Sequence, residues 1–123
     1  KYLQIRPQKK GEDGDPSYVK SPEFSGNVEK VDIVLDVKNG ATAGRMLYAV
    51  PVDTEIKFKA ADKDGNYVYS DDTYANPYGS VDATGVAGAQ KTVTINFNAD
   101  TNQFMLLAKG GARYIYSITV YVK

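Results

Sequence analysis

Apolar and polar residues alternate along much of this chain, and a period of two is typical of strands with one buried face. In residues 31–37 the odd positions are apolar, whereas Asp32 and Asp36 fall on the opposite face. Residues 92–98 repeat the pattern, with Thr and Asn between apolar side chains. From this alternation we expect the following residues to be buried: Ile33, Leu35, Val93, Ile95, Phe97, Ile118 and Val120.

The longest predicted strand covers residues 114–122 and ends the chain. Shorter strands are predicted at residues 45–52, 56–60, 67–69 and 104–107, and Gly, Asp and Asn turns separate them. If the long strand alternates without interruption, one of its faces carries Tyr114, Tyr116, Ile118, Val120 and Val122.

No segment shows the 3.6-residue period of a helix, and the strands leave no room for crossover helices. We therefore predict an all-β fold, an antiparallel β-sandwich of seven to eight strands that forms a single domain over residues 1–123. The polar stretches 8–25 and 70–90 fall outside the pattern; connections this long are functional, mobile or hold a short helix. Because the chain begins with Lys1, we expect it to be excised from a longer secreted or surface protein.

Charge and composition exclude several classes of function. The chain has 15 basic and 15 acidic residues and no charge blocks, so nucleic acid and anionic membrane are not expected partners. No apolar run reaches the ~20 residues of a membrane span. Histidine and cysteine are both absent, which excludes Ser-His-Asp, Cys-His and zinc hydrolase sites. The glutamates do not pair on one strand as glycosidase carboxylates would, so we expect no enzymatic activity.

The acidic turns raise the question of a metal. The segment from Asp62 to Asn66 has the composition of an EF-hand start, but its glycine lies at the wrong loop position, and a hairpin turn explains it better. A structural calcium held by irregular loops is the other possibility. Its candidate ligands are Glu12, Asp13 and Asp15, or Asp71 and Asp72.

The tyrosines of residues 66–80 are the main candidates for ligand binding. Tyr74 and Tyr78 flank Asn76 outside any alternation, where a planar ring can stack on a sugar. Asp72, Asn76 and Arg113 would then hydrogen-bond to its hydroxyl groups. The alternative is that both rings fold back over the edge of the sandwich. The absence of tryptophan counts against sugar binding, because the largest stacking ring is not used.

Two sequence motifs resemble a known kind of module. They are YVKSPEFSGNVEKV at residues 18–31 and GARYIYSITV at residues 111–120. Together they are similar to the jelly-roll modules, of galactose-binding-like and carbohydrate-binding type, in secreted or surface lipoproteins of Bacteroides-type bacteria. The resemblance implies a jelly roll with Phe24 and Ile118 in its core, and an extracellular, cell-surface or periplasmic location. It carries no sugar-contacting residue over to this chain.

The sequence thus leaves two functions open. The first is a non-catalytic carbohydrate-binding module whose partner is a glycan or polysaccharide. The alternative is a structural or cell-adhesion domain that contacts protein or an adjacent domain. An exposed, rigid pair of rings in residues 70–90 would favour sugar, whereas an apolar patch or an unpaired edge strand would favour protein.

Overall fold

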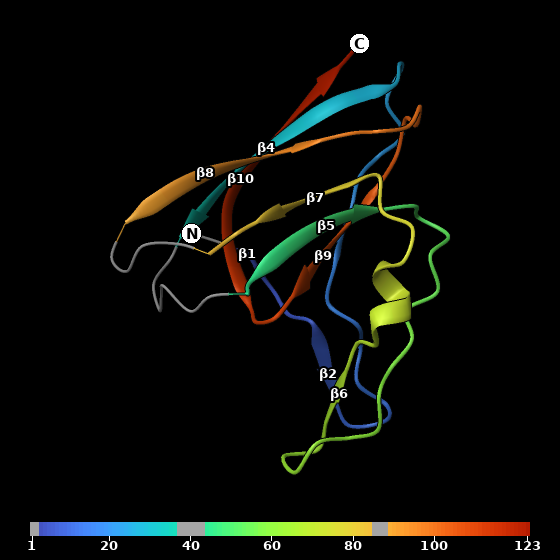
Figure 1. The fold of residues 1–123 in the computed structure, drawn as a ribbon, viewed down its shortest axis with the longest axis vertical. Coiled ribbons are helices and arrows are strands. Elements are labelled where there is room, and N and C mark those ends of the chain that lie inside the picture. Colours follow the sequence, from blue (N-terminus) through green and yellow to red (C-terminus); the bar gives the residue numbers. More distant parts are fainter. Residues whose placement is uncertain (1–2, 37–43, 85–88) are drawn as a thin grey trace.

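The computed structural model describes residues 3–36, 44–84 and 89–123 and has an all-β, antiparallel architecture, as predicted (Figure 1). Two four-stranded sheets form the sandwich. The first has the order β1 (Leu3–Ile5), β10 (Arg113–Val122), β4 (Val28–Asp36), β8 (Gln90–Asn96). The second has the order β3 (Val19–Lys20), β9 (Met105–Lys109), β5 (Met46–Val50), β7 (Gly79–Asp82).

A smaller pair of strands, β2 (Gln8–Lys10) and β6 (Asn66–Val68), extends beyond one end of the sandwich (Figure 1). The predicted strand at residues 56–60 is reduced to a single bridge between Phe58 and Tyr69. The turn after it has the predicted hairpin form, because Asp62 Oδ1 accepts hydrogen bonds from the main-chain N–H groups of Asp64 and Asn66. A short 3₁₀ helix, η1 (Asp71–Tyr74), follows within the long polar stretch.

Alternation along β4 and β8 places one side of each strand in the core between the sheets. Ile33, Leu35 and Ile95 are fully buried and Val93 nearly so, which confirms the prediction for these four residues. Phe97, Ile118 and Val120 pack against the core but are only partly buried, so the prediction was wrong in degree for them.

The predicted shared face of β10 is wrong, because a β-bulge interrupts the strand. Ile115 pairs with Leu35 and Ser117 pairs with Val34, which leaves Tyr116 as an extra residue. Arg113 and Ile115 are therefore buried before the bulge, and Ile118 and Val120 face the same interior after it. Tyr116 is 40% exposed.

Candidate binding sites

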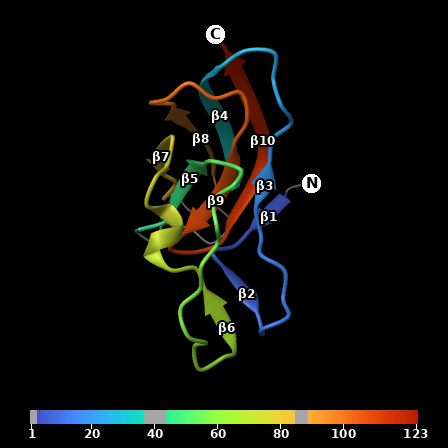
Figure 2. The same cartoon turned by 90° about the vertical axis from the view of Figure 1, so that its right-hand side faces the viewer.

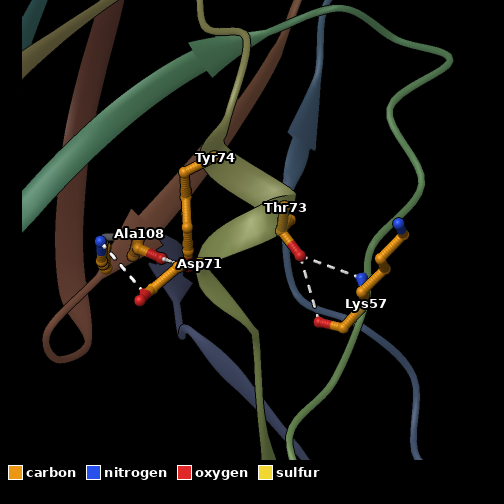
Figure 3. A network of polar contacts seen from close by, with 6 residues as sticks. Lys57, Asp71, Thr73, Tyr74 and Ala108 are labelled. Atoms are coloured by element: carbon orange, nitrogen blue, oxygen red, sulfur yellow. Dashed lines mark hydrogen bonds and ion pairs between the residues drawn. The ribbon is translucent and has the colours of Figure 1, made fainter.

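Tyr74, predicted as half of a sugar platform, lies in the core instead. Its side chain is 6% exposed, and its hydroxyl donates a hydrogen bond of 2.6 Å to the carbonyl of Ala108 in β9 (Figure 3). The ring centroid lies 4.8 Å from that of Tyr48. Burial raises the pKa of the Tyr74 phenol. This is the arrangement in which the ring folds back over the sandwich, so Tyr74 offers no ring face to a sugar.

Tyr78 is half-buried and packs in a different cluster of the core from Tyr74. Its ring stacks on Phe97, with centroids 5.6 Å apart and an interplanar angle of 17°. Phe97 in turn meets Phe104 edge to face. One face of the Tyr78 ring is therefore occupied, and the two tyrosines do not form a common platform.

Arg113 is also unavailable to a sugar in residues 70–80. It is 1% exposed, its Nη1 donates to the carbonyl of Ala83 at 2.9 Å, and its Nε donates to the carbonyl of Ala112 at 2.7 Å. Desolvation lowers its pKa, and the nearby positive charge of Arg45 lowers it further. The prediction that Arg113 contacts sugar hydroxyls beside Tyr74 is therefore not supported by its position.

Asp72 and Asn76, in contrast, line one polar pocket of about 300 Å³. The other wall comes from the loop after β5, through Pro51, Asp53, Thr54, Glu55 and Lys57. The two walls are held together by Thr73, whose hydroxyl accepts from the N–H of Lys57 at 2.9 Å and donates to its carbonyl at 3.1 Å (Figure 3). The pocket has carboxylate, amide and ammonium groups but no aromatic ring in its lining.

The predicted metal ligands are not brought together. Asp13 and Asp15 are exposed, and Asp71 forms an ion pair of 3.4 Å with Lys109. Within residues 3–36, 44–84 and 89–123, no group of three or more acidic, histidine or cysteine side chains is placed to hold a metal. Bound calcium stays a prediction that the structure does not test.

An apolar groove lies on one flank of the sandwich, between the edges of the two sheets. It encloses about 420 Å³, and Figure 2 shows β3 and β10 on this same side of the molecule. Its lining residues are Val19, Lys20, Ser21, Pro22, Phe24, Phe104, Ile118 and Val120. Sequence analysis assigned Phe24, Ile118 and Val120 to the core and missed the groove, because alternation shows which side of a strand faces inward but not whether a neighbouring strand covers it.

The opposite flank of the sandwich is closed. There the N–H of Asn98 donates to the carbonyl of Tyr78 at 2.9 Å, which joins the ends of β7 and β8 across the two sheets. Gly79 permits this approach, because a Cβ at its position would overlap the carbonyl oxygen of Asn96. The two flanks therefore differ: one is sealed by main-chain contact and the other leaves apolar core residues accessible.

Comparisons with known proteins give no family: no protein-family model, no curated protein and no solved structure matches this chain. The described residues include no helix that is long and apolar enough to span a membrane.

Proposed function

We propose that this domain is a non-catalytic recognition module that binds an extended polypeptide segment along β10, beside the apolar groove. One observation carries the proposal. On one side β10 pairs with β4 as far as Val122, but on the other side β1 pairs only with residues Arg113 to Ile115. In the described part of the chain, no strand pairs with the second side of residues 117–122.

The chemistry of this edge suits an added strand. An unpaired strand edge presents main-chain N–H and C=O groups that a further strand can satisfy, and the pocket beside it can accept alternate side chains. Ile118 and Val120 point inward, yet they are only partly buried, since the flank beside them is open. A strand laid antiparallel to β10, in line with β1, would cover both of them.

The outer surface of this region exposes apolar side chains near the unpaired edge. Soluble proteins commonly place lysine, proline or a covering loop beside such an edge, and Lys20 and Pro22 line the groove here. Here Tyr121 and Val122 of β10 are 41% and 40% exposed, and Leu3 at the start of β1 is 50% exposed. Exposed apolar side chains beside an unpaired edge favour protein contact.

We also infer jelly-roll connectivity, which the order of strand pairing supports. The eight strands of the two sheets pair first with last: β1 with β10, β3 with β9, β4 with β8 and β5 with β7. This is the pairing of one long antiparallel hairpin folded over on itself, as in a jelly roll. The extracellular or cell-surface location implied by the resemblance is part of the same proposal.

Selection from a displayed library of extended peptides tests polypeptide binding. We expect selected peptides to alternate apolar and polar residues, and to shift the amide resonances of residues 117–122. Val120→Lys places a charge in the groove and should weaken binding by at least about tenfold, because the charge would be desolvated by the peptide. Thr92→Lys is the matched control, since Thr92 is exposed on β8, the strand at the opposite edge of the same sheet.

Three results would contradict this function: no enrichment of any peptide, equal binding to the two lysine variants, or chemical-shift changes confined to other parts of the surface. Melting curves of both variants show whether the fold has survived the substitutions.

Glycan binding is the second candidate, and the polar pocket favours it. Sugar hydroxyls are recognised by converging carboxylate and amide groups, and Asp72 and Asn76 face Asp53, Glu55 and Lys57 there. In a glycan array, the double variant Asp72→Ala with Asn76→Ala should abolish any binding, whereas Asp13→Ala, an exposed aspartate outside the pocket, should not change it. An array without any bound glycan would remove this candidate.

A further inference from the structure

Two arginine side chains converge at one end of the sandwich, where β10 begins and β5 is about to start. Arg113 Nε and Arg45 Nη1 both donate to the carbonyl oxygen of Ala112, at 2.7 and 3.3 Å. The side chain of Arg45 crosses Gly111, where a Cβ would lie 2.9 Å from its Nε. Two guanidinium groups thus share one neutral acceptor.

Among the side chains that the structure describes, no carboxylate forms an ion pair with either arginine. The ion pairs found there join Lys109 to Asp71 and Lys123 to Asp100, and neither involves an arginine. Segments 37–43 and 85–88, which lie outside the described residues, contain no Asp or Glu in their sequence. A buried charge is stable only when it is paired and hydrogen-bonded, so two adjacent arginines without a counter-ion require an explanation.

The hydrogen-bonding capacity of Arg45 is also incompletely used. Its Nε is buried and has no acceptor in the described part of the structure, and its one hydrogen bond there is the long one from Nη1. Nε–H and an adjacent Nη–H form a planar fork that matches the two oxygens of a carboxylate, sulfate or phosphate group. Arg45 is half-buried, so solvent reaches part of it, whereas Arg113 is fully buried behind its two carbonyl partners.

We propose that Arg45 and Arg113 form a binding site for an oxyanion group, with Arg45 as the bidentate ligand and Arg113 as the buried charge that strengthens it. Because Arg113 lies in a medium of low dielectric, its field at the site is only weakly screened. The carboxylate, sulfate or phosphate group of a larger ligand would supply the missing negative charge. This site lies outside both the apolar groove and the polar pocket, so it does not depend on the proposed function.

Thermal unfolding with sodium sulfate, phosphate or acetate, against chloride at the same ionic strength, tests the site in the full chain. At tenfold its Kd the bound anion should raise Tm by about 3–6 °C and the effect should saturate. The ¹⁵N resonances of the Arg45 and Arg113 Nε–H groups should shift with the same Kd. A response to acetate would identify a carboxylate ligand, and a response to sulfate or phosphate alone would identify a tetrahedral one.

Charge variants separate a specific site from general salt effects. Arg45→Gln should raise the Kd of the anion by about tenfold or more, because the substitution removes a charge-assisted pair of hydrogen bonds. Arg45→Lys keeps the charge without the fork and should bind with intermediate affinity. Lys63→Gln removes an exposed charge in the turn before β6 and should bind the anion as the wild type does. If no anion gives a saturable shift, or if Arg45→Gln responds like the wild type, the proposal is overturned.

Discussion

Removing the hydroxyl of Tyr74 tests whether this residue is part of the core. Tyr74→Phe keeps the ring against Tyr48 but leaves the carbonyl of Ala108 without its donor at 2.6 Å. Ala108 is fully buried, so water does not readily replace the lost bond. An unsatisfied buried acceptor costs about 1–3 kcal/mol, and we expect the free energy of unfolding to fall by that amount. At about 4 °C per kcal/mol for a domain of this size, Tm should fall by roughly 4–12 °C.

Urea and thermal unfolding measure this loss, and Tyr18→Phe is the matched control. Tyr18 is 44% exposed, so the same chemical change there should alter stability by no more than about 0.5 kcal/mol. Tyr74→Ala additionally removes the ring and should cost about 3–5 kcal/mol, the usual range for a buried aromatic. If Tyr74→Phe is as stable as the wild type, the hydroxyl is not bonded as described, and Tyr74 becomes available again as a ligand-binding ring.

The same variant has a predicted pH dependence. Burial, and then the charges of neighbouring tyrosines, raise the folded-state pKa of Tyr74 above the unfolded value of about 10. The unfolded chain therefore releases this proton first, and the stability due to the neutral phenol is full below pH 10 and is lost as the pH rises further. The difference in stability between wild type and Tyr74→Phe should shrink between pH 10 and 12. A difference that stays constant over that range would show that the phenol titrates normally.

Four further predictions concern the scaffold. Ile95→Ala should cost about 2–5 kcal/mol in urea unfolding, since Ile95 is 0% exposed, and a loss below 1 kcal/mol would contradict its place in the core. Gly79→Ala should destabilise by about 1–3 kcal/mol, because the added Cβ would overlap the carbonyl oxygen of Asn96 at the end of β8; unchanged stability would mean that the two sheets can separate at the closed flank. Thr94→Val should raise the pKa of Asp32, which is lowered chiefly by a 2.6 Å hydrogen bond from Thr94, and an unchanged NMR titration of Asp32 would refute this. The variant should also be less stable than the wild type at neutral pH, and this difference should vanish in acid, where the carboxyl is protonated in both the folded and the unfolded state. Millimolar calcium tests the predicted structural calcium: a rise in Tm that a chelator reverses would support a site in the acidic loops, and an unchanged Tm would leave those aspartates as solvated turn residues.

The central strands could be predicted because local pattern and tertiary environment agree there. Each of β4 and β8 turns one face to the core, so Ile33 and Ile95 appear in the sequence with a strict period of two. The long strand β10 could not be predicted by the same rule, because it changes phase at its bulge. Ile115 and Ile118 are three residues apart and both face inward, and this odd spacing was the available indication of an inserted residue.

The predicted sugar-contacting roles of Tyr74 and Arg113 were wrong for a different reason. The partner of Tyr74 is Ala108, 34 positions along the chain, and the partner of the Arg113 Nη1 is Ala83, 30 positions back. No local pattern reports such contacts, and a tyrosine in a polar stretch looks the same whether its ring packs inward or faces solvent. Asp72 and Asn76 were easier to place, because short polar side chains beside a turn are usually exposed and here face a pocket.

The bulge in β10 connects the fold to both proposed sites. Pairing with β1 ends at Ile115, at the residue where the bulge begins, so the strand is covered on both sides before it and on one side after it. The extra residue also shifts the alternation of inward and outward side chains by one position. As a result Arg113 faces the interior before the bulge and Val120 faces the groove after it. A regular strand could direct Arg113 and Ile115 inward only by turning Ile118 and Val120 outward, and the groove would then lose its apolar wall. The bulge is therefore the feature that allows one strand to bury a charge beside Arg45 and also to offer an apolar, unpaired edge to a partner.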